Sequence, residues 1–237
     1  MIRICSAYPD LMSLYGDYAN AAALVRLLRE AGKTVEHVSF TLGENIPDCD
    51  MIFFTAGSEK AMLAALEDLL PKRERLQMLL ENGTKILATG NSMAMFGSSV
   101  VDLQDESIAA LDFADYACRI LPTRSYSERL LTFAPAQVEI VGVVNSSLDI
   151  FKPENPLTSM FTASSAIPFD KTEGYASGNL YTTEQIGPLL VKNPALLHYF
   201  AEFLVGEAIP LSTAAWQVHA MEAYKNIRTI LEQNSAK

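Results

Sequence analysis

Residues 85–99 (KILATGNSMAMFGSS) hold the pattern in this chain that could present a nucleophile. Ile86 to Thr89 form a short apolar run, which predicts a buried strand. The glycine and asparagine that follow predict a sharp turn, with a helix starting near Ser92. Many enzymes use a strand, a tight turn and a helix to hold a catalytic side chain at the top of a sheet. Here the residue at the bend is Gly90, which offers no side chain for chemistry.

Ser92 is the nearest residue that could replace a missing nucleophile. Residues 90–94 (GNSMA) resemble the G-x-S-x-G motif of a hydrolase elbow, and such a serine needs a histidine and a carboxylate. The histidines, His37, His198 and His219, fall on an expected strand and on expected C-terminal helices. The other interpretation is that Ser92 caps the helix that follows. The sequence favours the cap, and a hydrolase that uses Ser92 stays open as an alternative.

The remaining candidates for nucleophilic or metal chemistry are poorly placed. The three cysteines, Cys5, Cys49 and Cys118, are odd in number and have neither C-x-x-C nor metal-ligand spacing. Buried free thiols in a reducing compartment are the simplest interpretation. His198 and His219 have no Asp, Glu or Cys at metal-ligand spacing. The sequence therefore predicts no metal site and no cofactor.

Strands and helices alternate over the first hundred residues. Strands are expected at 2–8, 34–40, 50–54 and 86–89, and helices at 19–31, closed by Gly32, and at 58–82, interrupted at Pro71. This order predicts an α/β fold with a doubly wound, mostly parallel sheet. Such sheets bind ligands outside the carboxyl ends of their strands. We therefore expect residues 8–10, 55–57 and 89–91 to lie side by side at one edge.

The second half of the chain has a different pattern. Residues 117–183 contain several short apolar runs separated by Pro, Ser, Asn and Gly, which predicts extra antiparallel strands and loops. Two helices are expected to close the chain, at 193–206 with Asn193 as its cap, and at 211–233 with Ser212 as its cap. There is no internal repeat and no low-complexity linker, so we predict a single domain over residues 1–237.

The composition excludes several classes of partner. Apolar residues make up 49% of the 237 residues and charged residues 19%, which is typical of a globular protein. The net charge of −10 argues against nucleic acid or anionic membranes, because phosphate binding needs a basic face. The start of the chain lacks the layout of a secretory signal, and no apolar run is long enough to span a bilayer. We expect a soluble, cytoplasmic protein without membrane insertion.

Residues 8–20 (YPDLMSLYGDYAN) resemble the YPDLxNLYGDxGN signature of the cobyric-acid-synthase-like class I glutamine amidotransferases, and most closely their GatD-type branch. Four later segments match the same family in order: 50–59 (DMIFFTAGSE), 86–97 (ILATGNSMAMFG), 141–147 (VGVVNSS) and 183–194 (TEQIGPLLVKNP). The resemblance runs from about residue 2 to about residue 203. It implies a flavodoxin-like amidotransferase fold and a single amidotransferase-like domain.

The resemblance also implies a mechanism and a partner. In that family a cysteine thiolate at the elbow attacks the side-chain amide of glutamine, a histidine carries the proton, and backbone N–H groups of a glycine-rich loop stabilise the oxyanion. The ammonia passes to a synthetase, which for the GatD-type branch is a Mur-ligase-like protein that amidates peptidoglycan precursors. A Mur-ligase-like or related synthetase is therefore the expected partner.

The sequence departs from the family at the residues that carry this chemistry. The position of the cysteine is Gly90 and the position of the histidine is Ile186, so no catalytic residue is expected at either. The family's glycine-rich loop has become Thr55-Ala56-Gly57, which together with Asn91 we expect to form a degenerate ligand pocket. Asp10 and Asp17 are interpreted as turn and cap residues that hold the signature loop.

The sequence therefore predicts a degenerate amidotransferase that acts as a binding or regulatory subunit of a synthetase. A hydrolase that uses Ser92, and a glutaminase subunit that is still active through unrecognised residues, remain as alternatives.

Overall fold

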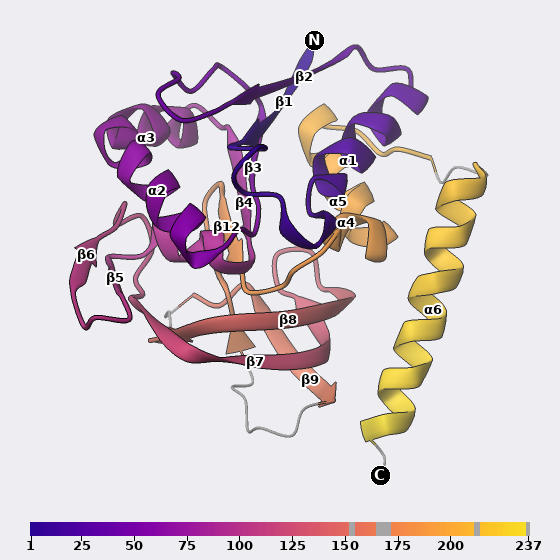
Figure 1. The fold of residues 1–237 in the computed structure, drawn as a ribbon. Coiled ribbons are helices and arrows are strands. Elements are labelled where there is room, and N and C mark those ends of the chain that lie inside the picture. The colour runs from indigo at the N-terminus through magenta and orange to yellow at the C-terminus, as the bar shows by residue number, and fades with distance from the viewer. Residues whose placement is uncertain (152–154, 165–171, 211–213, 236–237) are drawn as a thin grey trace.

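The main sheet carries the strands expected from the first half of the chain. In the computed structural model, which describes residues 1–151, 155–164, 172–210 and 214–235, this sheet has the strand order β11-β12-β4-β3-β1-β2 (Figure 1). The strands are β1 (Ile2–Ala7), β2 (Val35–Phe40), β3 (Met51–Phe54), β4 (Lys85–Thr89), β11 (Tyr175–Ser177) and β12 (Leu180–Thr183). Neighbouring strands are parallel except β11 and β12, which confirms the predicted mostly parallel sheet.

Helices cover both faces of this sheet. One face carries α1 (Ala19–Glu30), α4 (Leu189–Lys192) and α5 (Pro194–Val205), and the other carries α2 (Glu59–Leu69), η2 (Leu70–Lys72), α3 (Arg73–Glu81) and the 3₁₀ helix η3 (Gly90–Phe96). Successive strand side chains point to opposite faces. Met51 and Phe53 accordingly pack on the α1 side, and Ile52 and Phe54 on the α2 side. The prediction of a doubly wound sheet is confirmed, as is the interruption at Pro71, which lies in η2.

A second sheet follows, with the order β10-β9-β7-β5-β6 and with β8 paired to β7. Its strands are β5 (Ser99–Val101), β6 (Ser107–Ala109), β7 (Cys118–Phe133), β8 (Val138–Ile150), β9 (Thr158–Ser164) and β10 (Thr172–Glu173). The predicted antiparallel strands are present, but β7 and β8 are far longer than the short runs expected. The runs at 117–121 and 129–133 both belong to β7, whose register with β8 shifts between Ile120 and Ser125. A bulge of this kind lets one long strand show an interrupted apolar pattern.

The long β7–β8 hairpin crosses the carboxyl end of the main sheet, as Figure 1 shows below β4 and β12. The hairpin contacts the start of α2 there, because Ser147 of β8 donates a hydrogen bond to Glu59 at 2.7 Å. The edge at which parallel sheets bind ligands is therefore covered by the second sheet.

The last helix, α6 (Ala215–Ser235), lies along the side of the molecule (Figure 1). Its Leu231 packs against Leu130 and Val141 of the β7–β8 hairpin. The expected cap Ser212 lies outside the described residues. Asn193 does stand immediately before α5, but its side chain does not cap that helix, because it bonds to the backbone of Val141 instead. In the described parts of the chain, no helix has both the length and the apolar content that crossing a bilayer requires.

Candidate functional site

The three predicted strand ends do meet at one edge, because β4, β3 and β1 are consecutive in the sheet. The segment after β4 begins at Gly90, whose φ of 60° is in the left-handed region. Glycine adopts that region without strain, whereas residues with a Cβ rarely do. The Gly90 N–H donates to the carbonyl of Gln185 at 3.0 Å. The sharp turn predicted between the strand and the helix is therefore present.

Gly90, which the resemblance places at the nucleophile position, is also crowded. A Cβ on Gly90 would lie 2.7 Å from the Cβ of Ala56 and 3.0 Å from Cγ2 of Ile186. Ile186 is itself buried. Gly90 and Ile186, the predicted positions of the nucleophile and the histidine, thus lie side by side, as the resemblance implied. The contact between them is apolar.

The helix after the turn differs from the prediction. It is the seven-residue 3₁₀ helix η3, and it starts at Gly90 rather than near Ser92. The N-cap position belongs to Thr89, so the expected cap role of Ser92 is wrong. Ser92 is fully buried, and its hydroxyl contacts the carbonyl oxygens of Thr89 at 2.8 Å and Phe54 at 3.0 Å. A serine held in this way has neither a histidine contact nor exposure, which disfavours it as a nucleophile.

The predicted pocket residues come together, but their polar groups are already hydrogen-bonded within the protein. The Asn91 side chain accepts a hydrogen bond from the Gly57 N–H at 3.0 Å and donates to the Gly57 carbonyl at 2.8 Å. The Thr55 hydroxyl donates to the Met12 carbonyl, and Met12 packs so closely on Gly57 that a Cβ there would overlap its sulfur. The backbone amide of Gly57 therefore already donates to a side-chain carboxamide.

Asp17 connects this loop to the elbow. It is fully buried, and its Oδ2 accepts hydrogen bonds from the Ala56 N–H at 3.0 Å and the Thr89 hydroxyl at 3.3 Å. Burial raises the pKa of Asp17 to about 7, and the hydrogen bond from Ala56 acts in the opposite direction. Asn20 accepts a hydrogen bond from the Leu190 N–H at 2.8 Å. Asp17 and Asn20 thus hold the signature loop through bonds to the loop after β3, the end of β4 and the start of α4. The N-cap position of α1 is Tyr18, so the Asp17 carboxylate does not act as the expected helix cap.

Lys192, a buried charged residue next to Ile186 and Asp17, was not predicted from the sequence as a site residue. Its ammonium group donates to the carbonyl of Ile186 at 2.8 Å. Burial lowers the pKa of Lys192 to about 8, while the nearby Asp17 raises it. Its hydrogen bond holds the loop that carries Ile186. The sequence signal was its place in the matched segment 183–194, which gave no hint of burial.

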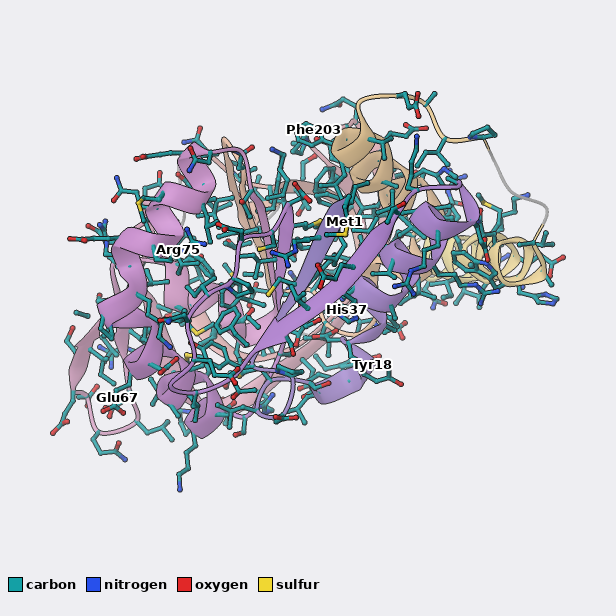
Figure 2. All side chains as sticks on the ribbon, turned by 90° about the horizontal axis from the view of Figure 1, so that it is seen from above. Met1, Tyr18, His37, Glu67, Arg75 and Phe203 are labelled. Atoms are coloured by element: carbon teal, nitrogen blue, oxygen red, sulfur yellow. The ribbon has the colours of Figure 1, made fainter. Side chains whose placement is uncertain are left out.

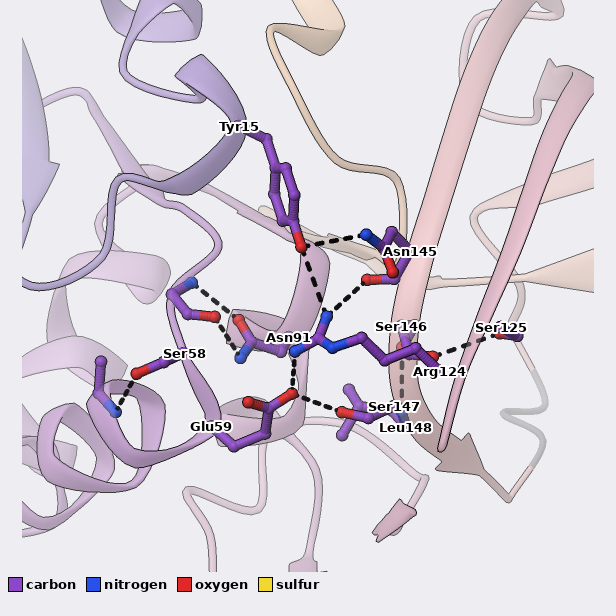
Figure 3. A network of polar contacts seen from close by, with 12 residues as sticks. Tyr15, Ser58, Glu59, Asn91, Arg124, Ser125, Asn145, Ser146, Ser147 and Leu148 are labelled. Carbon is purple, nitrogen blue, oxygen red and sulfur yellow. Dashed lines mark hydrogen bonds and ion pairs between the residues drawn. The ribbon is translucent and has the colours of Figure 1, made fainter. Parts of the chain in front are cut away.

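A polar network closes the front of the site, and Figure 3 shows it from close by. Arg124 of β7 forms an ion pair with Glu59 and donates to the Asn145 carbonyl at 3.1 Å and the Tyr15 hydroxyl at 3.4 Å. The Asn145 amide donates to the same hydroxyl at 3.3 Å, and Ser147 bonds to Glu59. We call Tyr15, Glu59, Arg124, Asn145 and Ser147 the mouth network. It ties the β7–β8 hairpin across the elbow.

A second buried cluster lies on the other side of Ile186. Burial, with Glu173 nearby, raises the pKa of Glu184 to about 7, and Arg129 lies 3.8 Å from its carboxylate. Glu173 accepts hydrogen bonds from the Thr183 hydroxyl at 2.7 Å and from the Glu184 N–H at 2.9 Å. These contacts fix the segment that leads into Ile186.

The cysteines are buried free thiols, as predicted. A hydrogen bond with Cys49 and burial raise the pKa of Cys5, and burial raises that of Cys118. Asp10 lies exposed in the turn after β1. Within the described residues, no three or more His, Cys, Asp or Glu side chains gather in a way that could hold a metal ion.

No family profile matches the chain. The chain is 24% identical over 198 residues to subunit GatD of lipid II isoglutaminyl synthase (glutamine-hydrolyzing) from Staphylococcus aureus strain N315, covering 81% of this chain and 80% of that protein. A solved glutamine amidotransferase superposes with a TM-score of 0.56 at 14% identity, over 85% of this chain and 98% of the other. The second likeness concerns the fold alone.

Proposed function

We propose that this chain, a GatD-like member of the class I glutamine amidotransferase family, does not hydrolyse glutamine and acts as a binding or regulatory subunit of a synthetase. Amide hydrolysis through an acyl-enzyme needs a nucleophile, a proton carrier and free donors for the oxyanion. Gly90 provides no nucleophile, and Ile186 provides no proton carrier.

The contact between Asn91 and Gly57 is the observation that carries the proposal. The Asn91 carboxamide makes two hydrogen bonds to Gly57, at 3.0 and 2.8 Å, and so occupies the donor that a substrate amide would require. An incoming glutamine would have to displace this internal amide and gain no covalent chemistry in return. The Asn91–Gly57 contact therefore opposes glutamine hydrolysis independently of the residues at Gly90 and Ile186.

A synthetase partner is supported by the related protein, whose name describes it as a subunit of a synthase. We propose a Mur-ligase-like partner in the cytoplasm that acts on a peptidoglycan precursor. In such a complex the chain would contribute its surface rather than ammonia, and it would alter the stability or the activity of the synthetase.

The test is ammonia release from glutamine by the purified chain, alone and with a Mur-ligase-like synthetase from the same organism. We expect no release above the buffer rate in either case. Release by the unmodified chain would overturn the proposal and would favour a glutaminase that uses unrecognised residues.

The matched positive control restores the chemistry. Gly90→Cys with Ile186→His supplies the nucleophile and proton carrier, Ala56→Gly makes room for the new Cβ, and Asn91→Gly frees the Gly57 N–H. Ammonia release by this variant alone would mean that the scaffold is intact. Co-elution of the unmodified chain with the synthetase on size exclusion tests the partner, and two separate peaks at micromolar concentration would contradict it.

A further inference from the structure

Ser6 and His37 form a second candidate site, on the face of the main sheet that carries α1. Ser6 Oγ lies 2.9 Å from His37 Nε2. The residues stand on the neighbouring parallel strands β1 and β2, where Ser6 pairs with Ser39 and His37 with Ile4. Because side chains alternate along a strand, Ser6, His37 and Ser39 share the face on which Ile4 packs under α1. The fold thus brings a hydroxyl and an imidazole into hydrogen-bond contact at the edge of the sheet.

The environment of His37 favours its neutral form. Partial burial lowers the pKa of His37, and the positive charge of Arg29 on α1 acts in the same direction. A neutral imidazole protonated on Nδ1 leaves Nε2 free to accept the Ser6 proton. Ser6 and His37 are both accessible to solvent, unlike Ser92. A serine hydroxyl in contact with a neutral, accessible histidine supplies the nucleophile and the base of a hydrolase site, without the carboxylate of a full triad.

A small cavity adjoins Ser6. It measures about 20 Å³ and is lined by Ser6, Pro9, Ser13, Tyr18 and Ala21, among others. Figure 2 shows Tyr18, which precedes α1, on the same side of the molecule as His37. The first turn of α1 therefore borders the cavity, as does the buried carboxyl of Asp17. The volume suits a group of one or two heavy atoms beyond the reacting carbon.

We propose that Ser6 and His37 are a nucleophile and general base that take a small acyl group from an activated ester. Ser6 Oγ bonds to the acyl carbon while its proton passes to His37 Nε2. That proton moves to the leaving oxygen as the ester C–O bond breaks, which leaves acyl-Ser6 and an alcohol. Water then attacks the acyl group, His37 again takes and returns a proton, and a carboxylic acid is released. None of these steps uses the elbow residues.

The test uses the full chain and two probes, p-nitrophenyl acetate and a fluorophosphonate. Peptide mapping of the unmodified chain should place the phosphonate on Ser6. Ser6→Ala should abolish both labelling and ester hydrolysis above the buffer rate. His37→Gln should slow both about 100-fold, because a general base contributes that much or more.

Two control variants separate this site from its neighbours. Ser39→Ala removes an exposed serine on the same strand face as His37, and Ser92→Ala removes the buried serine of the elbow. Both should leave labelling unchanged. Absence of phosphonate on Ser6 in the unmodified chain, or labelling that survives Ser6→Ala, would overturn the assignment.

Discussion

The crowding at Gly90 can be measured as a stability difference. Gly90→Ala places a Cβ 2.7 Å from that of Ala56 and 3.0 Å from Ile186, at a φ of 60°. A non-glycine residue in the left-handed region costs about 1–2 kcal/mol, and overpacking a buried site adds about 1–3 kcal/mol. We therefore expect Gly90→Ala to lower the free energy of unfolding by about 2–5 kcal/mol.

Gly178 provides the matched control for backbone strain. It has a φ of 57° in the turn between β11 and β12, and a Cβ there would meet nothing within 4 Å. Gly178→Ala should therefore cost only the strain, about 1–2 kcal/mol. The excess at Gly90, about 1–3 kcal/mol, measures the crowding itself.

The assay is urea unfolding followed by circular dichroism, with the slope against urea required to stay constant. A double-mutant cycle with Ala56→Gly completes the measurement, because that change removes the nearest atom. The double variant, Gly90→Ala with Ala56→Gly, should lose less free energy of unfolding than the two single variants lose in total, by at least about 0.5 kcal/mol. Equal costs for Gly90→Ala and Gly178→Ala, or additivity within the cycle, would refute the assignment of Gly90 to a closed elbow.

Three further changes probe the loops around the elbow. Asn91→Ala should leave the buried Gly57 amide without its partner, costing about 1–3 kcal/mol and speeding its hydrogen exchange; unchanged exchange would contradict its occupancy. Arg124→Ala removes a partly exposed ion pair with Glu59, so it should cost at most about 1 kcal/mol in unfolding while accelerating exchange in the β7–β8 hairpin. The pKa of Asp17 is about 7 in the folded state against 3.8 unfolded, so the protonated form favours folding. The stability that this group contributes is fully present below about pH 4. It falls as the pH rises to 7, by up to about 4 kcal/mol. Asp17→Asn should flatten that interval, and an unchanged pH profile by urea unfolding would argue against a buried protonated carboxyl.

Much of the main sheet could be predicted because its signals are local. The apolar spacing of residues 19–31 and the buried runs at 50–54 and 86–89 need only their own neighbours in sequence to be interpreted. The adjacency of the strand ends followed from the parallel order alone. The left-handed turn at Gly90 was visible as a glycine at a strand end.

The contacts that close the site join positions far apart in the chain, and their partners left no local signal. Arg124 and Glu59 are 65 residues apart, and Asn145 and Tyr15 are 130 apart. Polar residues in such positions are indistinguishable from solvated ones in the sequence. The pairing of Ser6 with His37 depends on the register of two strands, which composition does not determine.

The side-chain caps expected from Ser92 and Asn193 are absent for a common reason, although Asn193 does occupy the N-cap position of α5. Ser92 and Asn193 both stand where a polar side chain could bond to the first turn of a helix. In the fold each finds backbone partners on another element, namely Phe54 for Ser92 and Val141 for Asn193. A cap inferred from sequence assumes that the side chain bonds to the first turn of its own helix. Burial beside another element offers backbone groups that take its place.

The bonds made by Asp17 and Asn20 bear on how related genes are sorted. Within the YGDYAN segment, Asp17 and Asn20 hold backbone N–H groups of neighbouring segments, at Ala56 in the loop after β3 and at Leu190 in α4. The segment therefore reports that the scaffold assembles, whether or not the scaffold has a working elbow. A genome survey that selects sequences by this segment will gather chains with a cysteine and a histidine at the positions of Gly90 and Ile186 together with chains like this one. Sorting that set by the residues at the positions of Gly90 and Ile186 would divide it into the two groups whose ammonia release the proposed function predicts to differ.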